Sequence, residues 1–520
     1  MSWGIDKILI FAIIIVVNKN FILSLERKTI QNMAEKEVRT RFAPSPTGFM
    51  HVGNLRTALY EYLIAKSMDG DFILRIEDTD RERIVPGAVE VIYQTLSLVG
   101  LEHDEGPDIG GYYGPYIQSE RKYLYKKMAE KLVAEGKAYY CFCSKERLDK
   151  LHDEKSESGE FSGGYDRHCR NLSQEEVEKF LAEGKPYVIR QKVPLQGSTT
   201  FEDAVYGSIT VENSEIEDQI LLKTDGYPTY NFANVVDDHD MHITHVVRGS
   251  EYLSSTPKYN LLYDAFGWEK PTYIHLPLIA GKNADGTVSK LSKRHGATGF
   301  EDLVKLGYLP QAIINYISLL GWCPKENKEI FSLDELVEAF SIDRICKSPA
   351  VFDYDKLNWF NAEYIRAMSL EAFTELAIPY FKSVIKEELD WKKLASMLQQ
   401  RVIVLTQIPE MISFFADLPD YEKELFVNKK SKTNLENSPI MLKHAIEELN
   451  QLNEWSYESI HDSLVNLAER LQVKNGTTMW PVRIAASGMT VTPGGAVEIL
   501  ELLGKEESLR RLDIGLKKLS

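Results

Sequence analysis

Two short apolar segments near the start of the chain have the composition of buried strands. They are "VRTRFA" (residues 38–43) and "DFILRI" (71–76), with β-branched and aromatic side chains. Apolar side chains between them recur at helical spacing until Gly70, which ends the helix. This apolar face consists of Val52, Leu55, Leu59, Tyr62 and Leu63. The pattern predicts a strand, a helix and a second strand, the repeating unit of an α/β fold.

The hydrophobic pattern is different toward the C-terminus. After "VFDYDKLNWFN" (351–361), apolar positions follow the helical period in "SLEAFTELAIPYFKSVI", "NSPIMLKHAIEELNQL" and "YESIHDSLVNLAERL". Strand-like runs are few in this region, and we find no internal repeat or low-complexity tract in the sequence. The chain is therefore predicted to end in a helical domain.

Composition limits the size and the partners of the protein. The chain has 520 residues, 44% hydrophobic and 27% charged, which is enough for several cores and for three or more domains. Its formal net charge is −16, so a polyanionic partner must bind to a local basic surface instead of being attracted by the whole molecule. Five cysteines are too few for a disulfide framework and favour a reducing compartment.

An apolar segment near the N-terminus is too short to cross a membrane. "ILIFAIIIVV" (Ile8–Val17) has about half of the roughly 20 apolar residues that a membrane-spanning helix needs. Only Lys7 precedes it as a basic residue, and no small-residue cleavage site follows, which disfavours a signal peptide. We expect residues 1–32 to be a non-native leader or a disordered extension, with the working protein beginning near Met33 and no membrane partner. A peripheral membrane anchor is the alternative.

The loop between the first strand and the first helix is rich in turn-forming residues. It reads "RFAPSPTGFMHVGN" (41–54), and its backbone amides at the helix N-terminus, together with the small Gly48 and Gly53, leave room for a phosphate chain. Ordinary turn chemistry is the alternative interpretation. A second loop, "KLSKRHG" (290–296), carries two lysines three positions apart between glycines, an arrangement suited to a triphosphate. A solvated run of charge is the alternative there.

The two loops together resemble a known family. "HVGN" and "KLSKR" resemble the HIGH and KMSKS signatures of class I aminoacyl-tRNA synthetases. "PSPTGFMHVGN", "RIEDTDR", "YPTYNFANVVDDH" and "SPAVFDYDKLNWFN" resemble, in order and spacing, the motifs of bacterial-type glutamyl-tRNA synthetases. The resemblance extends from about Val38 to the C-terminus.

This resemblance implies an α/β fold with a class I synthetase Rossmann-like nucleotide-binding domain. That domain is expected in two halves, 33–114 and 224–300, separated by an inserted tRNA acceptor-binding domain at 115–223. A helical stem-contact domain at 301–370 and an all-α anticodon-binding domain at 371–520 are expected to follow.

The implied activity is that of a glutamate–tRNA ligase. ATP activates L-glutamate as an adenylate, and the glutamyl group then passes to the terminal ribose of tRNA(Glu), with release of pyrophosphate and AMP. ATP and Mg²⁺ are the implied cofactors. Whether tRNA(Gln) is also charged with glutamate stays open. The family further implies a cytoplasmic monomer.

The resemblance assigns roles at the phosphate end of the site. Its catalytic residues here are His51, Gly53, Asn54, Lys290 and Lys293. Its ATP-binding residues are Thr47, His51, Gly53, Glu251 and Lys293. Asn54 departs from the histidine that ends the HIGH signature, so we expect it to have a weaker role because it carries no charge.

Glutamate recognition requires cations for two carboxylates and an acid for one ammonium. The family's glutamate pocket corresponds to Arg41, Ala43, Ser45, Glu77, Tyr230, Asn234 and Arg248. Arg41 is expected to bind the side-chain carboxylate, with Arg248 as the alternative or a second ligand. A structural role is the alternative for two of these residues: Arg41 pairing with Asp80, and Glu77 capping a helix together with Asp78.

Three cysteines form a candidate zinc site of structural function. "CFC" places Cys141 and Cys143 close together, and Cys169 follows an acidic loop. Some family members bind Zn²⁺ there with a tyrosine four residues before the last cysteine, which is Tyr165 here, and His168 is a reserve ligand. Buried thiols without a metal are the alternative.

The sequence disfavours a histidine metal site and several related classes of protein. A metal site at His239, His242 and His245 fits neither its local context nor the family. Glutaminyl enzymes carry β-barrels where this chain is helical, and a shortened paralogue that modifies a tRNA base lacks the helical domain. A small-molecule nucleotidylyltransferase would have no use for the helical domain. A non-catalytic tRNA-binding relic would have lost the signature residues, which are present.

Overall fold

The computed structural model describes residues 38–158, 164–283 and 285–520, with the side chains of 155–158 and 293 left outside the description. These residues form two compact units. The first comprises the chain up to Glu301 together with Ile314–Phe352, and the second comprises Asp302–Ile313 and Asp353–Ser520. The apolar segment at 8–17 lies outside the described residues. Within them, no helix is both long and apolar enough to cross a membrane.

The predicted strand, helix and strand open the first unit. Strand β1 (Arg39–Phe42) pairs in parallel with β2 (Asp71–Leu74), and α2 (Val52–Ser67) connects them. All five residues of the predicted apolar helix face lie within α2, and the four strand residues of β1 and of β2 are buried. Gly70 is required where the helix returns to the sheet, because a Cβ there would lie 2.4 Å from the carbonyl oxygen of Val38.

A second sheet continues this nucleotide-binding fold. Its strand order is β6-β5-β9-β8; the pairs β5·β9 and β8·β9 are parallel, and β5·β6 is antiparallel. The main-chain N–H of Thr244 donates to the oxygen of Arg39 and so joins β8 to β1. The bounds of these strands and of the two helices beside them are β5 Ser198–Asp203, β6 Gly207–Glu212, β8 His245–Gly249, β9 Thr272–Leu276, α7 Tyr230–Asp240 and α8 Thr256–Phe266.

A small three-stranded sheet carries the loop at 290–296, which we call the lysine loop. Strand β10 (Ile279–Lys282) pairs antiparallel with β11 (Val288–Lys290) and parallel with β12 (Ala350–Phe352). The loop after β11 leads into a short 3₁₀ turn, Lys293–His295. The helices that follow are α9 Phe300–Lys305, α10 Pro310–Ser318 and α11 Leu333–Ala339.

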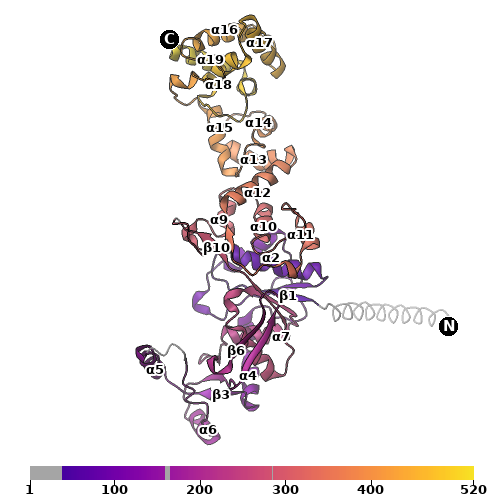
Figure 1. Cartoon of the computed structure of the whole chain (residues 1–520), viewed down its shortest axis with the longest axis vertical. Coiled ribbons are helices and arrows are strands. Elements are labelled where there is room, and N and C mark those ends of the chain that lie inside the picture. The colour runs from indigo at the N-terminus through magenta and orange to yellow at the C-terminus, as the bar shows by residue number, and fades with distance from the viewer. Residues whose placement is uncertain (1–37, 159–163, 284) are drawn as a thin grey trace, which may run out of the picture. The chain divides into compact units, whose positions relative to one another are not determined.

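Residues expected to form an inserted domain fold around a separate antiparallel sheet, β3-β4-β7. In Figure 1, β3, α5 and α6 lie together at one end of the first unit, away from β10. Strands β5 and β6 also fall within 115–223 but belong to the sheet with β9. Helix α3 (Ala88–Val99) precedes this region. The bounds of the elements within it are α4 Lys122–Ala134, β3 Ala138–Cys141, α5 Lys145–Ser158, α6 Gln174–Ala182, β4 Val188–Gln191 and β7 Ile220–Leu222.

The second unit is helical, as the apolar spacing predicted. The helical segments quoted from the sequence correspond to α13, α16 and α17, and α13 accommodates Pro379 within its length. The core includes Phe373, Leu442 and Leu464, which are fully buried. The bounds are α12 Tyr354–Ala367, α13 Leu370–Val384, α14 Trp391–Leu398, α15 Ile408–Ala416, α16 Ser438–Asn450, α17 Tyr457–Arg470, α18 Asn475–Ser487 and α19 Ala496–Leu519.

Candidate active site

A cavity of about 620 Å³ in the first unit collects most of the residues that the sequence singled out. It lies at the carboxyl end of β1, where ligands bind in open α/β sheets. The sequence-predicted residues on its wall are Arg41, Ala43, Ser45, Thr47, His51, Gly53, Asn54, Glu77, Tyr230, Arg248, Glu251 and Lys290. Asn234 does not line the cavity, and the side chain of Lys293 lies outside the described part of the structure.

His51 begins helix α2, which borders one end of the cavity. It is the N-cap of α2, and its Nδ1 accepts a hydrogen bond of 3.1 Å from the N–H of Gly53. Burial and the neighbouring Lys290 lower the pKa of His51, so the ring is neutral at pH 7. With Nδ1 as the acceptor, the neutral ring carries its proton on Nε2.

The two signature loops are held side by side by main-chain hydrogen bonds. The N–H of Val52 donates to the oxygen of Thr298 at 2.9 Å, and the N–H of Phe300 donates to Met50 at 2.8 Å. These bonds place the segment that follows the lysine loop against the start of α2. The resulting arrangement brings a helix N-terminus and a basic loop to one phosphate-sized space.

Gly53 and Lys290 differ in how they border this space. A Cβ at Gly53 would lie 3.3 Å from Nδ1 of His51, so a larger residue would crowd the helix cap. Lys290 is 71% exposed at its side chain, and its Nζ lies 3.7 Å from Glu251. Asn54 is exposed on the first turn of α2. The ion pair of Lys290 is long and exposed, so the lysine remains open to a ligand.

Arg41 is tightly held at the opposite end of the cavity. Its Nε donates to Asp238 at 3.0 Å and its Nη1 to Glu61 at 3.1 Å, and it is 4% exposed. The structural alternative from the sequence, a pair with Asp80, is wrong, since Asp80 lies beside Arg83 on the surface. Arg41 therefore faces the cavity with its charge already matched by two carboxylates.

Glu77 lies in the same buried network, next to Arg75. Arg75 donates to Glu77 at 2.9 Å and pairs with Asp238 at 2.8 Å. Burial raises the pKa of Glu77 to about 6, and Arg75 opposes that rise. Helix capping was the structural alternative for Glu77 together with Asp78. Asp78 accepts from the N–H of Ser119, whereas Glu77 lies on the cavity wall.

Arg248, like Arg56 on the same wall, is a buried arginine without a carboxylate partner among the described residues. It is 6% exposed and donates to Thr256 at 2.8 Å and to His275 at 3.3 Å. Its guanidinium carbon lies 4.4 Å from the ring centre of Tyr259, a cation–π distance. Among the described residues no carboxylate oxygen lies within 4.0 Å of it. Arg248 therefore brings an unmatched positive charge to the cavity wall.

Tyr230 and Asn234 occupy successive turns of α7. Tyr230 lines the cavity, and its ring centre lies 5.9 Å from that of Tyr252. Asn234 is buried, and its amide donates to the main-chain oxygen of Tyr230 at 2.9 Å. In this structure Asn234 therefore supports the helix that carries Tyr230 and does not reach the cavity itself.

Sequence reasoning missed Glu61, Arg75 and Asp238 at this end of the site. Glu61 interrupts the apolar run "ALYEYLIA", and Asp238 belongs to the pair of acids in "VVDDHD" on a helix with a buried face. An acid in an otherwise apolar helical segment is unusual unless it is paired. That signal marked both positions, although the sequence did not reveal their partners.

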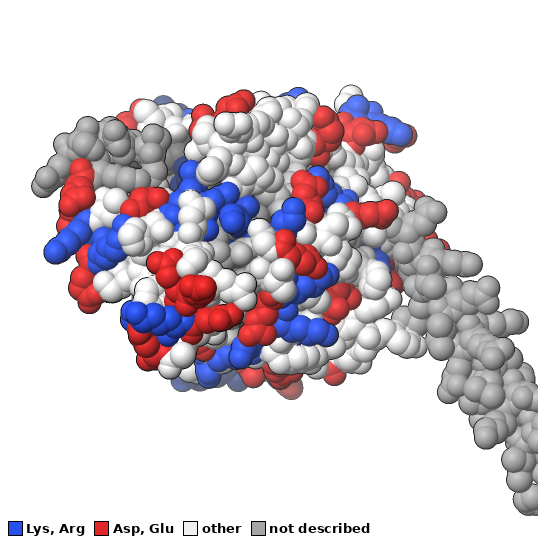
Figure 2. All heavy atoms as spheres, turned by 90° about the horizontal axis from the view of Figure 1, so that it is seen from below, with Lys and Arg blue, Asp and Glu red and all other residues white. Residues whose placement is uncertain are grey.

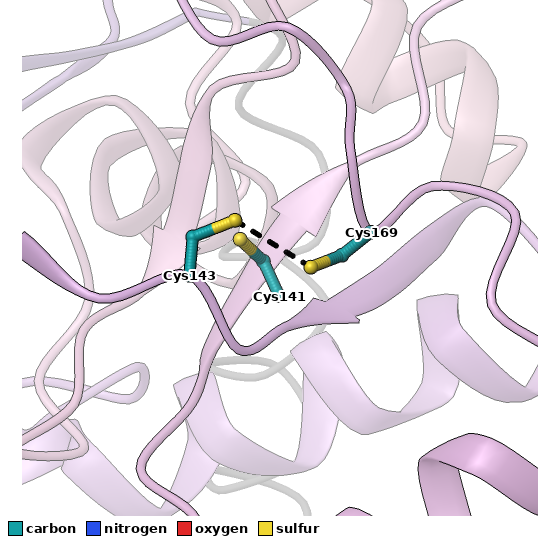
Figure 3. A group of neighbouring side chains, drawn as sticks. All are labelled: Cys141, Cys143 and Cys169. Atoms are coloured by element: carbon teal, nitrogen blue, oxygen red, sulfur yellow. Dashed lines mark hydrogen bonds between the residues drawn. The ribbon is translucent and has the colours of Figure 1, made fainter. Parts of the chain in front are cut away.

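The three cysteines converge in the inserted region. Sγ atoms of Cys141, Cys143 and Cys169 lie within 4.8 Å of one another, and Figure 3 shows the side chains pointing toward a common centre. The hydroxyl of Tyr165 lies 3.3 Å from Cys141 and 3.6 Å from Cys143. His168 is exposed. Three thiols and a phenol at these distances fit the soft, four-coordinate donor set that Zn²⁺ prefers.

The histidines of "DDHDMHITH" are separate from one another in their contacts. His239 stacks on Trp268 with ring centres 3.8 Å apart, His242 lies against the ring of Tyr113, and His245 contacts Thr244. In the described residues the cysteine group is the one cluster of at least three potential metal ligands. Each of the three histidines therefore has a different neighbour in the structure.

Two family descriptions match the chain. Residues 37–359 match tRNA synthetases class I (E and Q), catalytic domain, and residues 372–516 match an anticodon binding domain. The chain therefore belongs to the class I tRNA synthetases of the glutamate and glutamine group. The signature loops, the sheet that they border and the helical second unit agree with that assignment.

Two curated relatives and one solved structure are similar to this chain over most of its length. The chain is 58% identical to the glutamate–tRNA ligase of Clostridium kluyveri, over 93% of this chain and 98% of the relative. It is also 58% identical to the glutamate–tRNA ligase of Clostridium tetani, over 94% of this chain and 99% of that protein. A crystal structure of a glutamate tRNA ligase from Elizabethkingia meningosepticum, in complex with its amino acid, is 36% identical with a TM-score of 0.85, covering 93% of this chain and all of that one.

Proposed function

We propose that this chain is a glutamate–tRNA ligase that activates L-glutamate with ATP and transfers it to tRNA(Glu). The observation that carries the proposal is one cavity with two chemically different ends. Its phosphate end has His51 and Lys290, and its other end has buried Arg248 near Glu77. The close similarity to ligases of that name supports the same conclusion.

The first step is attack of the glutamate α-carboxylate on the α-phosphorus of ATP. Nε2–H of His51 donates to the phosphates, while Gly53 leaves room for the nucleotide and Thr47 and Glu251 border it. The Lys290 and Lys293 ammonium groups bind the β- and γ-phosphates more strongly as pyrophosphate forms, which lowers the barrier. Bound Mg²⁺ supplies further neutralisation of phosphate charge.

The opposite end of the cavity selects the amino acid. Glu77 accepts hydrogen bonds from the substrate ammonium, and Ser45 and Ala43 on the first loop border the substrate backbone. Arg248 binds the side-chain carboxylate because its charge is not used by a protein carboxylate. Arg41 donates to the same carboxylate from the other side, and Tyr230 closes the pocket.

The second step transfers the glutamyl group to a ribose hydroxyl of the tRNA, and AMP leaves. The inserted region at 115–223 binds the acceptor end, and the helical regions at 301–370 and 371–520 contact the stem and the anticodon. A groove of about 700 Å³ in the inserted region supports this assignment, since four lysines line it. They are Lys122, Lys126, Lys185 and Lys223. Figure 2 shows the face of the molecule seen from below, where Lys and Arg side chains lie among Asp and Glu side chains, so any attraction to tRNA there is local.

The cysteine cluster is a structural zinc site of this inserted region. Cys141, Cys143, Cys169 and Tyr165 would hold the ion, and Tyr165 is preferred to His168 because its hydroxyl lies beside two of the thiols. When bound, Zn²⁺ would link Tyr165 and Cys169 to the end of β3. The site takes no part in the chemistry at the cavity.

The test is a charging assay with the full chain, labelled amino acid and transcribed tRNA. We expect glutamate to be attached to tRNA(Glu) and glutamine not to be attached. Parallel reactions with tRNA(Gln) show whether the enzyme also charges that tRNA with glutamate. Absence of glutamyl-tRNA with either transcript, in the presence of ATP and Mg²⁺, would refute the proposal. Size-exclusion chromatography of the same preparation tests our expectation that the cytoplasmic enzyme is a monomer.

A further inference from the structure

Glu61 is a buried acid on the wall of the amino-acid end of the cavity. It lies in the apolar middle of α2, is 1% exposed and is among the residues that line the cavity. Neither step of the proposed reaction uses Glu61. Burial of a carboxylate is costly unless both oxygens are satisfied, so its presence here needs a physical cause.

The two oxygens of Glu61 differ in their partners. Oε1 accepts from Nη1 of Arg41 at 3.1 Å, whereas the buried Oε2 has no hydrogen-bond partner among the described residues. An ionised carboxylate would leave Oε2 as an unsatisfied acceptor, and a protonated one would carry a donor with nothing to bind. In either form Oε2 lacks the hydrogen-bond partner that a buried polar atom requires, on a side chain that belongs to the cavity wall.

The charges around Glu61 are balanced before a substrate binds. The charged groups that face it are Arg41 from β1, Arg75 after β2 and Asp238 from α7. When the remaining arginines of the cavity wall and of this network are counted with their carboxylate partners, five arginines are matched by five carboxylates. The arginines are Arg41, Arg56, Arg75, Arg121 and Arg248, and the carboxylates are Glu61, Glu77, Asp237, Asp238 and Asp240. Glutamate adds two carboxylates and one ammonium, so its binding leaves this buried site with one excess negative charge. Glutamine adds no net charge.

We propose that Glu61 takes up one proton when glutamate binds and then donates a hydrogen bond from Oε2 to the side-chain carboxylate of the substrate. The proton comes from the solvent, Glu61 becomes a neutral carboxylic acid, and no other bond changes. Burial raises the pKa of Glu61 well above its ordinary value, which favours the neutral acid. The inference rests on the proposed function, because it concerns the same amino-acid pocket.

This role makes glutamate binding depend on pH with a defined sign. Above the pKa of Glu61 in the free protein, each bound glutamate must bring a proton, so affinity falls by roughly tenfold per pH unit. Below that pKa the group is already neutral and affinity is flat. Glutamine needs no proton, so its weak binding should not follow this dependence. A merely structural ion pair with Arg41 would produce neither effect.

The experiment is calorimetric titration of the full chain with L-glutamate at pH 8 in two buffers, phosphate and Tris, that differ in ionisation enthalpy. The difference in heat gives the number of protons taken up. Glu77, with a pKa of about 6, is already ionised at this pH and takes up none. We expect close to one proton per glutamate in the parent protein and close to none in Glu61→Gln, whose amide mimics the neutral acid.

Glu105→Gln is the matched control. Glu105 is 4% exposed and is paired with Arg39 at 3.1 Å, but it does not line the cavity, so this variant should keep the parental proton uptake. Glutamate binding to the parent without proton uptake, or full uptake in Glu61→Gln, would overturn the inference and leave the proposed function intact. No glutamate binding to the parent, even with tRNA(Glu) present, would overturn both. If Glu61→Gln does not fold, the parental proton count alone decides.

Discussion

Arg248 and Arg41 are both buried arginines on the cavity wall, but their partners differ. Arg41 is bound by Asp238 and Glu61, whereas Arg248 donates only to neutral groups such as Thr256 among the residues that the structure describes. A substrate carboxylate gains most from the charge that is not already matched. The sequence ranked Arg41 first for the side-chain carboxylate, and its partners in the structure favour Arg248 for that role.

We predict that Arg248→Leu lowers kcat/KM for glutamate. The loss should correspond to at least about 3 kcal/mol of transition-state stabilisation, because the bound carboxylate loses its charge partner. Glutamine, already a poor substrate, should lose much less, so the ratio of the two substrates is diagnostic. Arg41→Leu is the comparison variant, and it should also lower Tm because Glu61 and Asp238 are left unpaired. A parental substrate ratio in Arg248→Leu would transfer the selective role to Arg41.

The ionisation of Glu77 and that of His51 should affect different kinetic parameters, KM for glutamate and kcat. Glu77 has a pKa of about 6 and must be ionised to bind the ammonium, so KM for glutamate should rise as pH falls through 6. Burial lowers the pKa of His51, so its neutral ring, which caps α2, persists below its ordinary value of about 6.5. We therefore predict that kcat stays flat between pH 8 and about 6.5 and falls only at lower pH. An acid limb of kcat with its midpoint above about 6.5 would contradict this role of His51.

The residues on the cavity wall could be predicted from the sequence, and their partners could not. Arg41, Glu77 and His51 belong to short motifs with recognisable chemistry. The contacts of Arg41 come from Glu61 and Asp238, which lie 20 and 197 positions away along the chain. Nothing local indicates such pairs, because they depend on how α2 and α7 pack on β1.

At the scale of elements, the local periodicity was sufficient for β1, α2 and β2, which match the predicted segments. It was insufficient for β5 and β6, whose position was assigned by sequence order to the inserted region. Their place in the catalytic sheet depends on the pairing of Asp203 with Tyr273 and on the contact of Asp203 with His275. Strand partners at such separations are a property of the whole fold.

The lysine loop is the element that should act on departing pyrophosphate. We predict that Lys293→Ala slows glutamate activation by raising its activation barrier by about 3 kcal/mol. KM for glutamate should stay nearly unchanged. Lys305→Ala, a lysine outside the cavity lining, is the control and should behave as the parent. Equal activation rates in Lys293→Ala and the parent would remove Lys293 from the site.

The cysteine cluster is the part of the fold for which we propose a bound metal. We predict about one zinc per chain, lost in the double variant Cys141→Ser and Cys143→Ser, with tRNA charging reduced more than adenylation. The matched control is Cys323→Ser with Cys346→Ser, since those sulfurs are also 3.6 Å apart but lack further thiols among the described residues. Tyr165→Phe should weaken zinc binding and His168→Ala should not. Zinc-free protein from a chelator-free purification would contradict the site.

At the scale of the whole molecule, the chain combines a nucleotide-binding unit with a helical unit that matches an anticodon binding domain at residues 372–516. The change in hydrophobic period along the chain predicted an α/β region followed by a helical region, and the resemblance to a family supplied the division into domains. With a net charge of −16, tRNA binding requires a local basic surface, and we propose the lysine-lined groove as one such surface. Such a groove is formed by residues distant in sequence, and composition therefore could not locate it.

The most direct measurement of the central claim is ATP–pyrophosphate exchange by the full chain, with glutamate as the amino acid and with or without tRNA(Glu). We predict exchange that depends on glutamate and appears only when tRNA(Glu) is bound. Glutamine in place of glutamate should give no exchange above background. Exchange supported equally by glutamine, or no exchange with glutamate, ATP, Mg²⁺ and tRNA(Glu) all present, would contradict the account.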